Sequence, residues 1–358
     1  QATVTGTTWS YTLQSGQELP ANGTLNYTIE AQDQAGNISI LSRTITLDTI
    51  DPSVDSRLAA ESDSGVSNSD NLTFDTTPTI KGTSDPLADI EVTFTTTNKT
   101  YTARADGDGN WSITVPDGDA LAEGNQAYTV KATDVAGNTT TINGTTIVVD
   151  ATAPINFTAG LDAQSDSADA RNTAGSNSDG ITSDTTPTLT GTVEAGSTVK
   201  VTIAGSTYDA TVAGNTWSLT WPNELAQGDY SYSAVATDAA GNSTAPATGD
   251  FTIDTAVSTF TGGLQAASDS GDSNTDGLTK VTTPIFAGTV EKGSVVLLAI
   301  NDKTYEATVD ANTGNWTVQV SDALNDQAHS YTLTAVDQAG NEQQLTGSIT
   351  VDTQAPTD

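Results

Sequence analysis

Short runs of alternating apolar and polar residues follow one another along the whole chain, separated by turns that contain Gly, Asn, Asp and Pro. Within residues 51–152 there are seven such runs, at 54–60, 79–82, 90–96, 100–105, 111–115, 127–133 and 145–149. A period of two is typical of β-strands, and no stretch has a convincing helical period. The pattern therefore predicts an all-β chain.

The strand pattern recurs with a period of about a hundred residues, which indicates a repeat protein. The string Asp-x-Ala-Gly-Asn occurs four times, at spacings of 134 − 33 = 101, 238 − 134 = 104 and 337 − 238 = 99 residues. A tryptophan, a tyrosine six residues before the string and an aspartate after the last strand keep step with it. They are Trp9, Trp111, Trp217 and Trp316; Tyr27, Tyr128, Tyr232 and Tyr331; and Asp48, Asp150, Asp254 and Asp352.

These spacings divide the chain into one partial and three whole units. The whole units are 51–152, 153–256 and 257–358, the last with the start of the next linker, and residues 1–50 match only the C-terminal half of a unit. Seven short strands per unit without cysteine fit an immunoglobulin-like β-sandwich that lacks the disulfide. We therefore expect tandem immunoglobulin-like β-sandwich repeats in an elongated rod, cut from a longer array.

Few large side chains are available to fill these sandwiches, since apolar residues make up 35% and aromatic residues 6% of the sequence. We expect the repeated tryptophan and tyrosine to anchor each core, because aromatic side chains bury the largest areas. Stacking of the tryptophan on a sugar is the alternative. Trp221 replaces the apolar residue found at Val115 and Val320. An overpacked core is preferred there to a surface contact with a glycan.

The charge balance excludes several classes of partner. With 45 acidic and 11 basic residues the net charge is −34, so nucleic acid and anionic membrane surfaces would be repelled. No segment reaches the roughly 18 apolar residues of a membrane span. The absence of cysteine excludes disulfides and thiolate metal sites.

Catalytic chemistry has few candidate residues. His329 is the only histidine, and the other repeats have none at that place. Ser–His and Cys–His pairs therefore cannot be assembled in each repeat. A hydrolase with paired carboxylates remains as an alternative. We expect that the chain is not an enzyme.

Aspartate recurs at fixed places in the first loop of each whole unit. These residues are Asp63, Asp70 and Asp75, then Asp166, Asp179 and Asp184, then Asp269 and Asp276, with Val281 where a third Asp is expected. The second unit has (176 − 167) − (67 − 64) = 6 extra residues around Arg171. Calcium takes hard oxygen ligands from flexible loops. The alternative is that these residues only form turns, but their repetition in register favours calcium.

Strand parity predicts where these residues meet. Successive strands run in opposite directions, so the first loop and the closing aspartate of one unit should face the Asp-x-Ala-Gly-Asn loop of the next. The expected groups are Asp63, Asp70, Asp75 and Asp150 with Asp238 and Asn242; Asp166, Asp179, Asp184 and Asp254 with Asp337 and Asn341; and, where the partial unit lacks its first loop, Asp48 with Asp134, Asn138 and Asp51 as a further candidate. The last unit adds Asp269, Asp276 and Asp352.

Seven ordered strings per unit support a family resemblance over the whole chain. Ser-Asp-Ser-Gly, Asn-x-Asp-Gly-Leu/Ile-Thr, Asp-Thr-Thr-Pro, Gly-Thr, Gly-Asn-Trp, Ala-x-Asp-x-Ala-Gly-Asn and Val/Ile-Asp-Thr/Ala resemble the bacterial Ig-like repeats of giant, type I-secreted non-fimbrial adhesins. The resemblance implies a secreted, extracellular stalk on a bacterial cell surface, with calcium between neighbouring repeats and a role in cell adhesion and virulence. Val281 departs from the pattern, so the first loop of the last unit has an incomplete set.

Two functions remain in contention. The first is a calcium-rigidified adhesin stalk whose partners are the neighbouring repeats of the same chain. In the second, the repeats themselves bind a host cell-surface glycan or protein. Buried tryptophans would favour the stalk, and exposed ones would favour ligand binding.

Overall fold

The computed structural model describes residues 1–20 and 22–356, and residues 357–358 of the third expected unit lie outside the described part. Among the described residues the regular structure is β-strand, apart from one short 3-10 helix, η1 (Asp117–Asp119). The chain divides into two compact units, Gln1–Thr152 with Ala239–Asn242, and Ala153–Asp238 with Ser243–Asp358. The prediction of an all-β chain is therefore confirmed.

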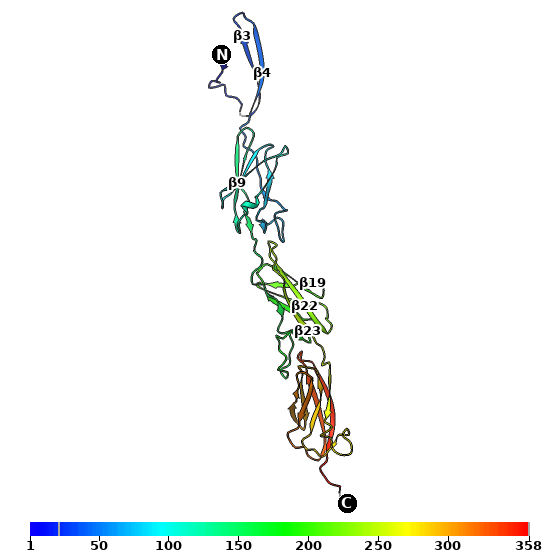
Figure 1. Cartoon of the computed structure of the whole chain (residues 1–358). Helices are drawn as coiled ribbons and strands as arrows, with labels where there is room; N and C mark the ends of the chain where they lie inside the picture. Colours follow the sequence, from blue (N-terminus) through cyan, green and yellow to red (C-terminus); the bar gives the residue numbers. More distant parts are fainter. Residues whose placement is uncertain (21, 357–358) are drawn as a thin grey trace. The chain divides into compact units, whose positions relative to one another are not determined.

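The N-terminal segment, blue in Figure 1, forms two hairpins. Their strands are β1 (Thr3–Thr5), β2 (Thr8–Ser10), β3 (Gly23–Gln32) and β4 (Ile38–Leu47). The side chains of Trp9 and Tyr27 are 52% and 44% exposed. A two-stranded sheet has no second sheet to pack against, so the aromatic residues that fill the whole repeats lie on the surface here. The four strands described in this segment pair only within their own hairpins.

The first whole repeat has three small sheets around one core. Strands β10, β7 and β5 form one sheet, β13, β12, β8 and β9 a second, and β11, β14 and β6 a third, in these spatial orders. The bounds are β5 (Arg57–Leu58), β6 (Leu72–Thr73), β7 (Thr79–Thr83), β8 (Asp89–Phe94), β9 (Lys99–Arg104), β10 (Asn110–Thr114), β11 (Gly124–Gln126), β12 (Tyr128–Thr133), β13 (Thr139–Asn143) and β14 (Ile147–Val149).

The second and third repeats share one two-sheet topology. The second pairs β15-β17-β21-β20 and β16-β23-β22-β18-β19, and the third pairs β24-β26-β30-β29 and β25-β32-β31-β27-β28. The second contains β15 (Gly160–Leu161), β16 (Ile181–Thr182), β17 (Thr188–Thr192), β18 (Thr198–Ile203), β19 (Ser206–Asp209), β20 (Thr211–Ala213), β21 (Thr216–Thr220), β22 (Gly228–Thr237) and β23 (Ala247–Ile253). The third contains β24 (Phe260–Leu264), β25 (Leu278–Thr279), β26 (Ile285–Val290), β27 (Val295–Ile300), β28 (Lys303–Glu306), β29 (Thr308–Val309), β30 (Asn315–Gln319), β31 (Gln327–Val336) and β32 (Glu342–Val351).

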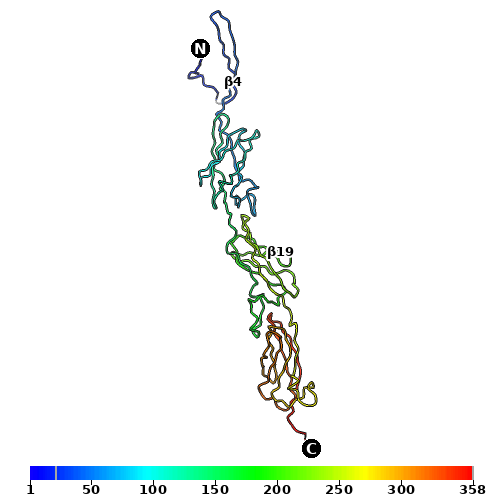
Figure 2. The backbone as a smooth tube through the Cα atoms, viewed as in Figure 1, coloured from blue at the N-terminus to red at the C-terminus, as the bar shows by residue number. Residues whose placement is uncertain are grey.

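The expected count of seven strands per repeat was wrong. Among the described residues, the second and third repeats have nine strands each, and the first has ten. The additional strands include β6, β16 and β25, which have two residues each and pair in parallel with the last strand of their own repeat. A strand of two residues is too short to show a period-2 pattern in the sequence. These strands form because the first loop lies against the last strand of the sandwich. Figure 2 traces the backbone as a tube coloured by residue number, with β19 of the second repeat labelled.

In the whole repeats the repeated tryptophans are buried in the cores, as predicted. Trp111, Trp217 and Trp316 are 4%, 1% and 1% exposed, and the additional Trp221 is 4% exposed. Trp221 packs edge-on against Tyr208, with ring centroids 4.9 Å apart. Trp221 is therefore a core residue and not a surface contact for a glycan.

Glycine makes room for these aromatic rings. A Cβ on Gly191 would lie 1.9 Å from the carbonyl oxygen of Thr158, to which Trp217 Nε1 donates at 2.9 Å. A Cβ on Gly249 would lie 2.4 Å from the Tyr232 hydroxyl. The strands can approach this closely only without a side chain. At Gly82, Gly191 and Gly288, the glycines of the three Gly-Thr strings, a Cβ would lie 2.1, 1.9 and 1.9 Å from a backbone carbonyl oxygen near the start of the same repeat.

Candidate metal centre

The Asp-x-Ala-Gly-Asn string folds as a self-contained turn between β31 and β32. Asn341 donates from its backbone N to Asp337 Oδ1 at 2.8 Å and from Nδ2 to Asp337 Oδ2 at 2.9 Å. Gly340 has a φ of +84°, which favours glycine. The string thus forms a turn that holds the carboxylate of Asp337 in one orientation.

The same asparagine also contacts the end of the preceding repeat. Asn341 Nδ2 donates to the carbonyl oxygen of Asp254 at 2.8 Å, immediately after β23. Within the first compact unit, Asn138 Nδ2 donates to Asp48 O at 3.2 Å and Asn242 Nδ2 to Asp150 O at 2.8 Å. The closing aspartate and the Asp-x-Ala-Gly-Asn loop are therefore neighbours.

Three carboxylates meet in the second compact unit. Oxygens of Asp254, Glu291 and Asp337 all lie within 4.8 Å of one another. Glu291 follows β26, and its Oε2 also accepts the backbone N–H of Ser258 at 2.6 Å. At an effective dielectric constant of about 20, two unit charges at this separation repel by roughly 3 kcal/mol. The group therefore favours either a bound cation or a shared proton.

The pKa values of Asp254 and Asp337 are both raised. Asp337 is 2% exposed, and its pKa is raised mainly by burial, with a further increase from the Glu291 charge. The pKa of Asp254 is raised by burial and then by the charge of Asp337. By contrast, hydrogen bonds from Asn138 lower the pKa of Asp134 in the first whole repeat. The charged forms of Asp254 and Asp337 are therefore disfavoured, whereas the charged form of Asp134 is stabilised.

A buried aspartate lies inside the first loop of each whole repeat. Asp63, Asp166 and Asp269 are 5%, 3% and 6% exposed, and in each the Oδ1 atom is buried without a hydrogen-bond partner. The other oxygen accepts a backbone N–H from Asn71, Gly180 or Gly277 at 3.1 Å. Burial raises the pKa of Asp63 and Asp166, and the charges of Asp70 and Asp179 raise them further.

The remaining predicted residues have turn-forming hydrogen bonds. Asp75 and Asp184 accept from the backbone N and hydroxyl of the threonine two residues later. The side chains of Asp70, Asp179, Asp276, Asp48, Asp150, Asp254 and Asp352 each accept the N–H two residues ahead. Asp238 is 7% exposed. Asp-rich loops therefore also act as turns, as the alternative interpretation proposed.

The structure brings fewer of these residues together than strand parity predicted. Asp254 meets Asp337 and Asn341, whereas Asp166 is paired with Asp179 in its own loop. In the part of the chain that the structure describes, no further group of three such ligands is this close. Within the first compact unit, the loop that carries Asp63 contacts the Ala239–Asn242 segment, where Ser64 Oγ donates to Ala240 O at 2.7 Å.

Sequence reasoning missed Glu291. Its counterparts, two residues after the Gly-Thr string, are Glu194 and Asp85, so an acid recurs there in all three whole repeats. Each accepts a linker N–H, from Ser258, Ile155 and Ser53 respectively. The recurrence was available in the sequence, but it lies at a strand end where a single acid looks like an ordinary surface residue.

Comparison with known proteins gives a family and several structural relatives. A model of the bacterial Ig-like domain matches residues 50–151, 158–255 and 256–353. No curated protein matches the chain, and no helix among the described residues is long and apolar enough to cross a membrane.

Three solved structures illustrate the likeness. A Ca2+-stabilized adhesin with which an Antarctic bacterium binds ice is 27% identical, with 95% of this chain and 84% of that chain covered and a TM-score of 0.36. A 1.5-MDa bacterial ice-binding adhesin is 26% identical, at 84% and 98% coverage and a TM-score of 0.37. A tetra-tandem repeat from the extending region of a large adhesion protein is 23% identical, at 93% and 83% coverage and a TM-score of 0.33. On the three matched ranges, the chain belongs to the bacterial Ig-like domain family.

Proposed function

We propose that this chain is a stalk segment of a bacterial surface adhesin, and that calcium rigidifies the junctions between its repeats. The observation that carries the proposal is the group of Asp254, Glu291 and Asp337, whose oxygens lie within 4.8 Å of one another. All of its ligand atoms are carboxylate oxygens, the type that calcium prefers. These residues come from the end of one repeat and from two loops of the next, so a cation there would join the two repeats.

Calcium would supply positive charge among groups that otherwise repel. Asp254 and Asp337 would hold it with Glu291, while Asn341 keeps Asp337 oriented. The unpartnered Oδ1 atoms of Asp63, Asp166 and Asp269 support a second cation position within each first loop. A buried carboxylate oxygen without a partner is costly and normally has a ligand.

The cellular role rests on the tandem order, the acidic composition and the resemblance of the repeats to those of giant adhesins, of which the non-fimbrial adhesin SiiE is a named example. Such a stalk is secreted by a type I system and lies outside the cell, where it supports adhesion. Burial of Trp111, Trp217 and Trp316 favours the stalk over repeats that bind a glycan through tryptophan. No catalytic role is proposed.

Calorimetric titration of the whole chain with calcium tests the proposal. We expect saturable binding that weakens in Glu291→Gln and is unchanged in Glu306→Gln, an exposed glutamate of β28 in the same repeat. Absence of heat at millimolar calcium, or equal binding by both variants, would reject calcium at this group.

A further inference from the structure

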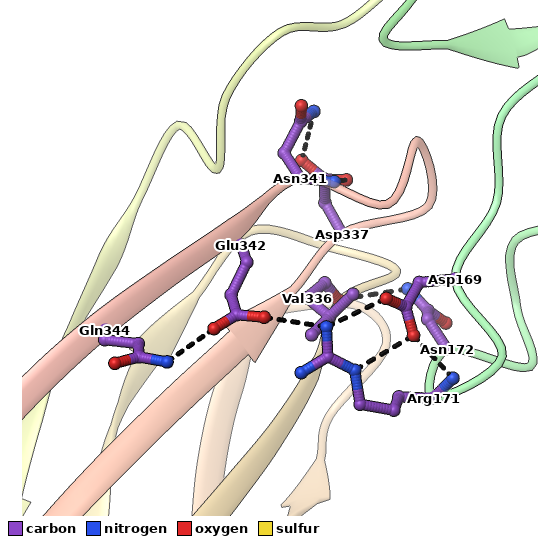
Figure 3. Close-up of polar contacts among 8 residues, drawn as sticks. All are labelled: Asp169, Arg171, Asn172, Val336, Asp337, Asn341, Glu342 and Gln344. Atoms are coloured by element: carbon purple, nitrogen blue, oxygen red, sulfur yellow. Dashed lines mark hydrogen bonds and ion pairs between the residues drawn. The ribbon is translucent and has the colours of Figure 1, made fainter.

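Residues 168–175 of the second repeat, which make its first loop six residues longer than those of the other whole repeats, contact the third repeat (Figure 3). Asn172 is 1% exposed, and its Nδ2 donates to Gly293 O at 2.9 Å and to Val336 O at 3.1 Å. Its Oδ1 accepts the N–H of Ala174 at 2.9 Å, which fixes the amide. One buried side chain of the second repeat therefore binds two backbone carbonyls of the third.

A charged contact lies beside this amide. Arg171 Nη2 donates to Glu342 Oε2 at 2.7 Å and to Asp169 Oδ2 at 2.8 Å, and its Nε donates to Asp169 Oδ1 at 2.9 Å. The guanidinium lowers the pKa of Asp169 to about 2 and also lowers that of Glu342. The planar guanidinium of Arg171 thus joins the carboxylate of Asp169 in its own loop to the carboxylate of Glu342 in the next repeat.

Glu342 and the lengthened first loop that it contacts are both specific to this pair of repeats. Glu342 follows the Asp-x-Ala-Gly-Asn string of the third repeat, where the other whole repeats have Thr139 and Ser243. Only the second repeat, which precedes the repeat that contains Glu342, has the lengthened first loop. The first loop also makes a contact that does not need them, from Ser167 Oγ to Ala339 O at 2.7 Å, which corresponds to Ser64 with Ala240. Residues 168–175 therefore add to a contact that the first loops of the first two whole repeats both make.

We propose that residues 168–175 are a protein clamp that holds the second and third repeats in a fixed orientation when no cation is bound. Repeats joined through small polar interfaces move relative to one another by default. The buried amide and the shared guanidinium oppose that motion, even though three carboxylates meet at the same junction. The clamp concerns the junction of the proposed calcium site but does not rest on calcium binding.

Distance measurement between two spin labels on the whole chain tests this clamp. The sequence has no cysteine, so Thr211→Cys in β20 and Thr346→Cys in β32, both exposed, give one label in each repeat. In a chelator we expect a narrow distance distribution, and roughly a doubling of its width in Arg171→Ala/Asn172→Ala. Thr173→Ala, exposed in the same segment, is the matched control and should leave the width unchanged. Emission from buried Trp217 and Trp316 verifies that both repeats are folded.

The outcomes separate the clamp from the calcium proposal. A parent chain as broad as the double variant in chelator, or a double variant that stays narrow, would overturn the clamp. If calcium narrows the double variant again, the cation holds the junction in its own right. If the double variant stays broad at saturating calcium, the calcium proposal fails at this junction and the clamp stands.

Discussion

At the scale of single residues, Asp337 combines two roles that work against each other. Its carboxylate accepts two hydrogen bonds from Asn341, which stabilise the turn, yet it is buried beside Asp254 and Glu291. Hydrogen bonds favour the charged form and burial disfavours it. The net result is a raised pKa, with burial as the largest cause. A residue needed only for the turn would not require two further acids at this distance.

Replacing Asp337 by Asn separates these roles. The side chain keeps an oxygen acceptor and loses the negative charge, so we expect weaker calcium binding, by at least the roughly 10–100-fold that loss of a supporting group around a metal costs. In chelator the melting temperature should change little, because removal of the repulsive charge offsets the loss of one of the two hydrogen bonds from Asn341. Calorimetry and thermal melts measure both effects. Asp302→Asn, in the exposed turn after β27, is the control, and an equal loss of affinity there would contradict the assignment.

The raised pKa values also predict a pH dependence in the absence of calcium. Asp254 and Asp337 bind protons more tightly in the folded chain than at their ordinary pKa of 3.8. Above that value the unfolded chain holds fewer protons, so their contribution to the free energy of unfolding falls as pH rises through the folded pKa. Asp169, with a pKa of about 2, has the opposite sign and loses its contribution as pH falls below 3.8.

We therefore expect Asp337→Asn to gain stability relative to the parent chain as pH rises from about 4 to about 7 in chelator. Urea unfolding at several pH values measures the difference. Saturating calcium should abolish or reverse it, because the metal competes with protons for the same oxygens. A difference that is flat with pH would show that these carboxylates are not strained.

At the scale of elements, the strand pairs depend on glycines that face the aromatic anchors. Gly191 in β17 lies under the Thr158 carbonyl and beside Trp217. We expect Gly191→Ala to destabilise the second repeat by about 3 kcal/mol or more, because backbone must move to relieve a 1.9 Å contact. Gly160→Ala in β15, which would meet nothing within 4 Å, should change little. Tryptophan emission during denaturation distinguishes them, and equal stability of the two variants would contradict the packing.

The indole hydrogen bonds predict a difference between equivalent tryptophans. Trp217 Nε1 donates to Thr158 O, whereas Trp111 Nε1 is buried without a partner. Both Trp→Phe changes lose packing, but only Trp217→Phe leaves a carbonyl unpaired. We expect Trp217→Phe to cost about 1 kcal/mol more than Trp111→Phe. Denaturant unfolding of each variant, followed by circular dichroism, provides the comparison, and a larger cost at Trp111 would refute it.

The sequence predicted elements well where side chains repeat and poorly where backbone pairing decides. Period-2 runs identified strands such as β8, β10 and β12, and the repeated tryptophans identified the core. The two-residue strands β6, β16 and β25 were missed because only the position of the first loop creates them. The junction group was predicted in part, because Glu291 approaches Asp337 only after the loops are folded. The hydrogen bonds from Asn172 to the third repeat could not be predicted either, because they also form only once the loops are folded.

At the scale of the whole molecule, tandem order predicts an extended particle. Three whole repeats of roughly 35–40 Å each, from strands of about seven to ten residues at 3.3 Å rise, would give a rod of about 120–140 Å with the partial repeat. Small-angle scattering at saturating calcium measures this dimension. A radius of gyration near the globular value of about 20 Å for this length would refute the stalk.

Calcium should control stability and shape together, because the net charge of −34 includes carboxylates gathered within a few ångströms of one another. At free calcium near a hundred times the dissociation constant, each site would stabilise the folded chain by about 2.7 kcal/mol, or on the order of 10 °C in the melting temperature of one repeat. Titration with a chelator, followed by melting and by scattering, should therefore lower the melting temperature and broaden the range of particle dimensions. The junction with residues 168–175 should resist this change longest, since Asn172 and Arg171 hold it through protein contacts. Magnesium at equal concentration is the control, because it demands stricter octahedral geometry and retains its water. If chelation changes neither quantity, the acidic loops act only as turns and the calcium proposal must be abandoned.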